Sequence, residues 1–217
     1  MKSLVLKDLY NIGHNAKSML VMLLVFAGIF LTTQRIESYI IVSGILCSMM
    51  VITTFSFDDS SKWVKYALVT PVTKKDVVKA KFAVLFIFSA IGTISGLVIG
   101  VIGGLFLRKV EINNITTVIT WLAIALVGFV ISVIFGSVSI PLLFKFGAEK
   151  ARMMSFVSML LPLGICFGIY QLLLLLGIGF TDTVIVVLLC SSPIIALLWN
   201  YIMYRISLAV FVNKDIG

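Results

Sequence analysis

The amino-acid sequence predicts an all-α polytopic membrane protein with six transmembrane helices. Of its 217 residues, 61% are hydrophobic and only 12% are charged, and the mean hydropathy is +1.19. A soluble domain carries about 25% charged residues. Because so many apolar side chains cannot all be buried in one small core, a lipid bilayer must solvate much of the surface. Long apolar runs separated by short polar turns indicate the number of spans.

The segment 1–18 is too polar and too short to cross a membrane. It carries three lysines, and its apolar residues recur at helical spacing, namely Leu4, Val5, Leu9 and Ile12. This pattern predicts an amphipathic helix in the cytoplasmic membrane interface. An ordinary leader with no separate role remains the alternative.

Six apolar segments follow in a single transmembrane domain, 19–217. The predicted spans are about 19–33, 39–57, 82–107, 117–144, 153–176 and 183–204. In the third span, Gly92, Gly96 and Gly100 are spaced four residues apart and share one helix face. Such a row lets another helix approach closely. It predicts either a sliding or dimer-forming seam, or static packing within one subunit.

The positive charges are distributed unevenly between the two sides of this predicted arrangement. An even number of spans places both termini on one side, together with the polar insert 58–81 and the turn 145–152. That side holds 14 of the 17 lysines and arginines, and the other side holds three. Cytoplasmic loops are the ones enriched in lysine and arginine, so we expect both termini and the insert to be cytoplasmic.

Residues that could support catalysis are nearly absent from the predicted spans. The only histidine, His14, lies in the leader, and the three cysteines lie inside apolar runs. The sequence has no GxxxxGK[ST] phosphate loop and no HExxH motif. We therefore expect this chain to be no enzyme by itself, to hold no metal or cofactor, and not to couple transport to ions. The net charge of +8 fits membrane orientation better than nucleic-acid binding.

The insert 58–81 is the one substantial polar segment between spans. Thr73 is followed three residues later by Asp76, which is the pattern of a capping box at a helix start. Pro71 disfavours helix just before it. An apolar side of the upstream half is formed by Trp63, Tyr66, Leu68 and Val69. The pattern predicts a helix, a turn and a second helix that continues into the third span. A solvated basic loop that only sets topology is the alternative.

Several features of the insert occur in a characteristic order. They are an acidic pair, an aromatic pair, a Pro-Val-Thr-Lys turn, and an apolar pair before a lysine, namely Asp58-Asp59, Trp63 and Tyr66, Pro71-Val72-Thr73-Lys74, and Val77-Val78 with Lys81. In this order they resemble the corresponding stretch of small bacterial permeases of ATP-binding-cassette (ABC) exporters of the second type. The start, MKSLVLKDLYNIGHN, resembles the interfacial helix of the same proteins. The later spans match only in general character.

The resemblance implies a six-helix subunit in the bacterial cell membrane that pairs with a second copy or a close paralogue. It also implies a separate cytoplasmic ABC ATPase, which binds ATP and magnesium and docks on a coupling helix of the permease. The residues this implies for docking are Thr70, Pro71, Val72, Thr73, Lys74, Lys75, Asp76, Val77 and Val78. Residues implied to support them are Asp58, Asp59, Trp63 and Tyr66. A second contact could come from the leader or from 145–152.

The leading hypothesis is therefore a permease subunit that exports an amphipathic or hydrophobic substrate, such as a peptide, a lipid or a drug. Relatives of this kind are linked with peptide export and antimicrobial resistance. The alternative is a membrane immunity or regulatory protein that binds a hydrophobic peptide and needs no ATPase. A neighbouring reading frame for a phosphate-loop ATPase would separate the two hypotheses. An intramembrane enzyme is disfavoured because no catalytic constellation is visible.

Overall fold

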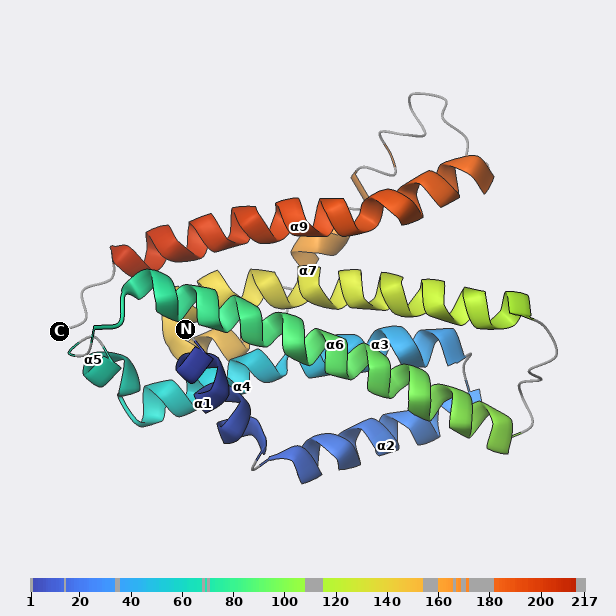
Figure 1. The fold of residues 1–217 in the computed structure, drawn as a ribbon, viewed down its shortest axis with the longest axis horizontal. Coiled ribbons are helices and arrows are strands. Elements are labelled where there is room, and N and C mark those ends of the chain that lie inside the picture. Colours follow the sequence, from blue (N-terminus) through green and yellow to red (C-terminus); the bar gives the residue numbers. More distant parts are fainter. Residues whose placement is uncertain are drawn as a thin grey trace.

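The described part of the chain is helical and contains no strand. The computed structural model describes residues 2–13, 15–33, 36–67, 69, 71–107, 115–153, 160–165, 167–168, 171 and 182–213. The helices, labelled in Figure 1, are α1 (Lys2–Gly13), α2 (Ala16–Thr33), α3 (Ile36–Ser48), α4 (Met50–Ser60), α5 (Trp63–Ala67), α6 (Lys74–Phe106), α7 (Ile115–Met153) and α9 (Asp182–Val212).

Four helical segments of the described chain are long and apolar enough to cross a membrane, which confirms a multi-pass membrane protein. They are Ile36–Ser60, Lys74–Phe106, Ile115–Lys150 and Ser191–Val212. The helices α1 and α2 qualify as a fifth only if they form one span with a bend of 64° between them. The fifth segment predicted from the sequence, 153–176, lies largely outside the described residues. The count of six and the orientation of the termini stay predictions.

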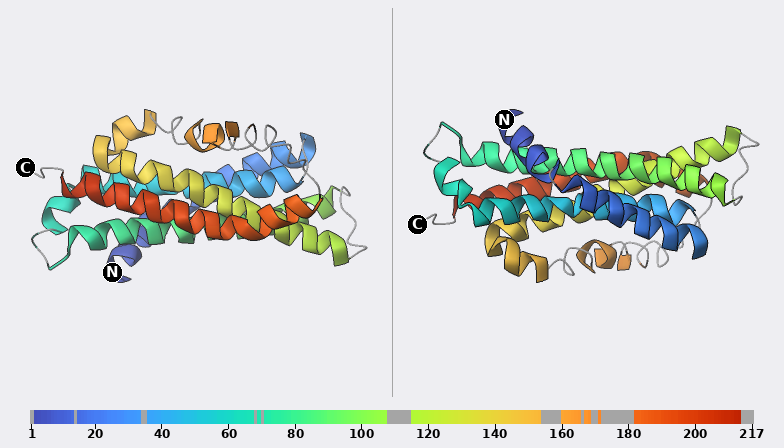
Figure 2. Two further views of the ribbon diagram at one scale, coloured as in Figure 1. Left: turned by 90° about the horizontal axis from the view of Figure 1, so that it is seen from above. Right: turned by 90° about the horizontal axis from the view of Figure 1, so that it is seen from below.

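The long helices run side by side along the longest dimension of the molecule (Figures 1 and 2). Helix α5 and the C-terminal end of α9 lie at one end of this bundle, and α1 crosses the bundle near that end. A hydrogen bond fixes part of this arrangement, because Lys74 Nζ donates to the Val212 carbonyl at 3.0 Å. The start of α6 and the C-terminal end of α9 therefore lie together at this end of the bundle.

The glycine row of α6 packs against α3 of the same chain. A Cβ atom added at Gly92 would lie 2.5 Å from Cys47 Cβ, and one added at Gly96 would overlap the Ser43 side chain. In addition, Ser43 Oγ donates to the Gly92 carbonyl at 3.0 Å. The absence of side chains on this face is what lets the two helices approach so closely. Of the two interpretations offered above, the described contacts are those of packing within one subunit.

The largest apolar core lies near the end of the bundle that holds the insert. The Phe144 ring of α7 lies 4.9 Å from the Phe55 ring of α4 and 4.6 Å from the Phe211 ring of α9, between centroids. Val78 and Ile12 belong to the same buried cluster. Because this core includes Ile12, α1 is packed onto the bundle, and its position in the membrane interface stays a prediction.

Candidate functional site

The insert folds as a helix, a turn and a helix, and a capping box starts the second helix. The Asp76 backbone N–H donates to Thr73 Oγ1 at 3.2 Å, and the Thr73 backbone N–H donates to Asp76 Oδ2 at 3.3 Å. Both bonds satisfy N–H groups that would otherwise lack partners near the start of α6. The turn is consequently tied to a helix of 33 residues that is a candidate membrane span.

The predicted docking residues divide into an exposed and a buried group. The side chains of Pro71, Thr73 and Lys75 are exposed, whereas Val72, Lys74 and Asp76 are partly buried. Val77 and Val78 are 2% and 0% exposed and belong to the core, so they support the turn from below. Thr70 lies outside the described residues.

Two further apolar side chains beside the turn are strongly exposed. Tyr66, at the end of α5, is 70% exposed, and Val69 is 88% exposed. The family resemblance implied Tyr66 as a supporting residue, and the sequence pattern placed Val69 with it on the apolar side of the upstream half. The structure places both at the end of the bundle, where the chain turns between two candidate spans. We call Tyr66, Val69, Pro71 and Val72 the turn surface.

Beneath the turn, four charged side chains from three helices form a buried charge cluster of Lys7, Asp8, Asp58 and Lys81. Lys81 Nζ lies 2.6 Å from Asp58 Oδ2 and 2.9 Å from Asp8 Oδ2. Lys7 Nζ lies 2.5 Å from Asp58 Oδ1 and 3.3 Å from Asp8 Oδ1. Two positive and two negative groups thus alternate around the cluster and balance each other.

The surroundings of the charge cluster make its pairing essential. The side chains of Asp8, Asp58 and Lys81 are 2–3% exposed, and that of Lys7 is 24% exposed. Lys81 Nζ also donates to Thr54 Oγ1 at 3.1 Å. Asp8 Oδ1 is near Lys7 Nζ but its geometry does not make a hydrogen bond, so this contact is the weakest of the four. Charges this deeply buried are tolerated only when they are paired.

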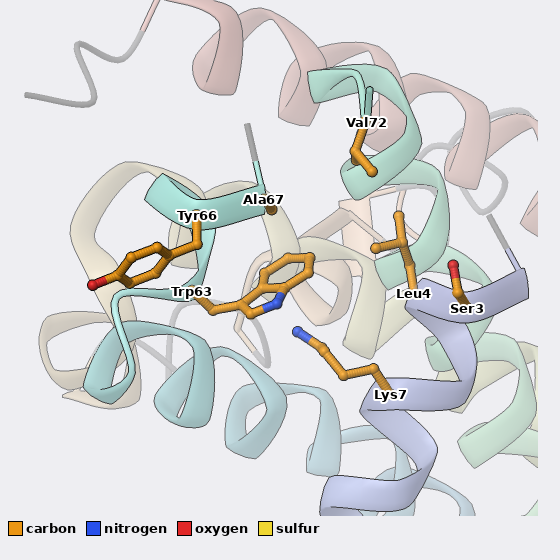
Figure 3. A pocket seen from close by; sticks show the side chains of 7 residues that line it. All are labelled: Ser3, Leu4, Lys7, Trp63, Tyr66, Ala67 and Val72. Atoms are coloured by element: carbon orange, nitrogen blue, oxygen red, sulfur yellow. The ribbon is translucent and has the colours of Figure 1, made fainter. Parts of the chain in front are cut away.

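Lys7 also connects the charge cluster to a hollow under the turn surface. Its Nζ lies 3.3 Å from the centroid of the Trp63 ring, a cation–π contact. Figure 3 shows the Lys7 ammonium pointing at the indole from α1. The hollow measures about 380 Å³, and its lining residues are Ser3, Leu4, Lys7, Trp63, Tyr66, Ala67 and Val72. Helices α1 and α5 and the turn therefore share one surface.

Asp59 makes a second link, from the end of α4 to the turn 145–152. Its Oδ2 accepts a hydrogen bond from the Ala148 backbone N–H at 2.7 Å. The preceding Gly147 has a φ of 78°, a conformation that glycine adopts without a steric penalty, and α7 breaks there. The carboxylate thus caps the helical turn after the break. The two adjacent acids that the sequence singled out consequently hold different elements.

The charge cluster is the feature that the sequence interpretation missed. One signal for it was present, because Leu4, Asp8 and Ile12 are spaced four residues apart and all three are buried. An acid on the apolar face of an amphipathic helix needs a buried cation as partner. Which lysine would serve could not be read from the spacing, since Lys81 lies 73 positions away in the sequence.

Comparison with known proteins assigns the chain at the level of a family. The model of a family described as "ABC-2 family transporter protein" matches residues 3–212, nearly the whole chain. No curated protein and no solved structure matches it.

Proposed function

The chain belongs to the ABC-2 transporter family, and from this premise we propose that it is the permease subunit of an ABC exporter, driven by a separate ATPase that docks on the turn surface. The sequence has no phosphate loop of its own. The ATP and the magnesium ion accordingly belong to the partner, and the family membership supports an ATPase subunit as the general kind of partner.

The observation that carries the docking assignment is the exposure of apolar side chains at the turn. Val69 and Tyr66 are 88% and 70% exposed at an end of the bundle rather than along its lipid-facing length. Exposed apolar groups that cluster on one solvated surface are typical of a contact with another protein. The neighbouring Lys75 is exposed and adds a positive charge at the rim.

The contacts beneath the turn surface supply a route for coupling. The capping box joins the turn to α6, and Lys81, two turns further along the same helix, joins α6 to Asp8 of α1 and Asp58 of α4. A displacement of the turn by the ATPase therefore acts on three helices together. Packed and hydrogen-bonded elements of this kind move as units rather than deforming continuously.

For the cargo, we propose an amphipathic or hydrophobic substrate that moves out of the cell. The supporting observation is the apolar character of the four candidate spans. Such spans provide few charged or polar side chains that could bind a highly charged solute. A second copy of the chain, or a paralogue, would complete the pathway. The turn surface and the charge cluster are formed within one subunit, so the docking proposal holds for either type of dimer.

The direct test replaces exposed residues of the turn surface and leaves the capping box intact. In nanodiscs containing the permease and its ATPase, we expect Tyr66→Ser with Val69→Ser to weaken ATPase retention about tenfold or more, since a buried apolar anchor in an interface contributes about 2 kcal/mol. Transport-coupled ATP hydrolysis should fall in parallel. Replacing Pro71-Val72-Thr73 by glycines should detach the ATPase as well, although that change also removes the helix cap.

A matched control comes from the opposite end of α6. Phe106 is also 88% exposed, so Phe106→Ser removes a similarly exposed apolar side chain far from the turn. This control should retain the ATPase. Normal assembly and coupled transport in the Tyr66/Val69 variant would contradict the docking assignment, and failure of any phosphate-loop ATPase to co-purify with the wild type would contradict the permease proposal itself.

A further inference from the structure

An open groove of about 410 Å³ lies between α6 and α9 and is separate from the turn surface. The two helices run in opposite directions (Figure 1), and two contacts fix their register. One is the hydrogen bond from Lys74 Nζ to the Val212 carbonyl. The other is an edge-to-face contact between the rings of Phe82 and Tyr204, whose centroids lie 5.9 Å apart. Each position on α6 is therefore level with a known position on α9.

Residues at helical spacing form the two sides of the groove. Lys79, Ala83 and Phe86 line it from α6 and share one face of that helix, because positions three and four apart are neighbours on a helix surface. Leu197 and Tyr201 line it from α9, again four residues apart. Apart from Lys79 at one end, these side chains are apolar or aromatic.

The length of the groove corresponds to the depth of one membrane leaflet. Leu197 precedes Tyr204 by seven positions and is therefore level with Ser89, which follows Lys79 by ten residues. Ten residues extend about 15 Å along a helix, and the hydrocarbon core of a bilayer is about 30 Å thick. Since α6 and α9 are both candidate spans, the groove has the dimensions to hold one acyl chain of a single leaflet.

Two cationic side chains stand together at the end of the groove nearest the turn. Lys79 is exposed there. Arg205 is exposed as well, and its Nη1 donates to Tyr201 Oη at 3.3 Å, which places it on the side of α9 that lines the groove. Arg205 follows Tyr204 by one position and is level with Lys81. The two cations thus differ by two positions, or about 3 Å, in height along the helix axes.

Acidic side chains scarcely offset this positive charge. In α6 and in residues 191–212 of α9, Asp76 is the only acid, and it is engaged with Thr73 in the capping box. Asp8 and Asp58, which reach α6 from other helices, are balanced within the charge cluster. This end of the groove therefore attracts an anion, whereas the rest of it suits a hydrocarbon chain.

We propose that the groove binds an anionic phospholipid of the leaflet on the side of the insert, with the lipid phosphate between Lys79 and Arg205. One acyl chain lies along the apolar part, from Ala83 to Leu197. Basic pockets between membrane-spanning helices bind anionic head groups on the cytoplasmic side, where the insert is predicted to lie. The site is formed within one subunit and does not depend on the ATPase, so it can be tested on the purified full-length chain.

The first test is a titration followed by native mass spectrometry, with the chain in a lipid-free detergent. The probes are palmitoyl-oleoyl-phosphatidylglycerol, which is anionic, and palmitoyl-oleoyl-phosphatidylcholine, which is zwitterionic and has the same acyl chains. We expect phosphatidylglycerol to bind about tenfold more tightly, because two cations meet its head group. Equal binding of the two lipids would overturn the proposal.

A pair of matched variants locates the preference for the anionic head group. Lys79→Gln with Arg205→Gln should reduce the tenfold preference to less than about twofold and leave phosphatidylcholine binding unchanged. Lys17→Gln with Lys150→Gln removes the same charge from two exposed lysines outside the groove and should keep the preference. An equal loss in both double variants would show that only the net charge attracts the lipid, which would overturn the site.

Photo-crosslinking locates the acyl chain in the wild-type protein and needs no variant. Phosphatidylglycerol with a diazirine in the middle of one chain should label peptides that contain residues 83–86 and 197–201. Unlabelled phosphatidylglycerol should prevent this labelling at concentrations at which phosphatidylcholine does not. The absence of labelling at these residues, as expected if a second copy of the chain covers the groove, would overturn the proposal, and so would equal competition by both lipids.

Discussion

Removing Lys81 from the charge cluster should destabilise the protein more than any surface substitution. In Lys81→Met, the carboxylates of Asp8 and Asp58 stay buried, with exposures of 2% and 3%, and only Lys7 remains to balance them. Breaking a buried ion pair by removing one partner costs about 3–5 kcal/mol, because it leaves an uncompensated charge. For a chain of this length, that loss corresponds to a decrease in melting temperature of about 10 °C.

The size of the effect can be separated from the loss of the lysine side chain by a double-mutant cycle. Adding Asp8→Asn to Lys81→Met leaves Lys7 opposite Asp58, and the cluster is neutral again. We therefore expect the double variant to be more stable than Lys81→Met alone, with a coupling energy of about 1–3 kcal/mol. Methionine is similar to lysine in length, so the packing against Phe55, whose ring centroid lies 4.7 Å from Lys81 Nζ, is largely kept.

The assay is thermal unfolding of the detergent-solubilised chain, followed by the loss of the monodisperse peak in size-exclusion chromatography. The four members of the cycle are measured in the same detergent and at the same pH. Lys81→Met that melts within about 1 °C of the wild type would refute the assignment of a buried, essential pairing. A double variant no more stable than Lys81→Met would show that the charge balance is not the cause.

Three further substitutions test other contacts. Gly96→Leu should lower the melting temperature by several degrees because the seam has no room for a side chain, whereas Gly28→Leu, which meets open space, should not. Thr73→Ala should cost about 1 kcal/mol in the same melting assay, the usual effect of a lost N-cap. Asp59→Ala should release the Ala148 backbone N–H, and hydrogen exchange at that amide should become faster; unchanged exchange would argue against the cap.

The sequence predicted the parts of this molecule that local pattern controls. The all-α class follows from long apolar runs, and the start of α6 follows from the spacing of Thr73 and Asp76, which the structure confirms as a capping box. The family resemblance is confirmed by the match over residues 3–212. The helix predicted to start near Thr73 and to continue into the third span is α6, which runs without interruption from Lys74 to Phe106.

The parts that could not be predicted depend on which helices meet in space. The glycine row indicated that another helix approaches α6 closely, but nothing in its spacing specified α3 as that helix. Nor did it specify Ser43 and Cys47 as the residues that occupy the space beside the glycines. The charge cluster joins residues 7, 8, 58 and 81, and such long-range pairs leave no periodic signal. A solvated basic loop was the alternative interpretation of the insert, and nothing in its composition indicated that Asp58 and Lys81 would be only 3% and 2% exposed.

The contacts of α6 explain how a force at the turn could reach the middle of the membrane. The helix has 33 residues and is therefore about 50 Å long. At its start it carries the docking turn, and at Lys81 it is joined to α1 and α4.

Further along, Ser43 of α3 donates to the Gly92 carbonyl at 3.0 Å, and its side chain fills the space at Gly96, so α3 cannot slide along α6 without losing that fit. Within the proposed function, the glycine seam thus makes α3 and α6 a single moving body. The reorientation that transport needs then has to occur where α6 packs less closely. The contact between α6 and α9 is such a place, because it leaves a groove of about 410 Å³ lined by side chains of both helices.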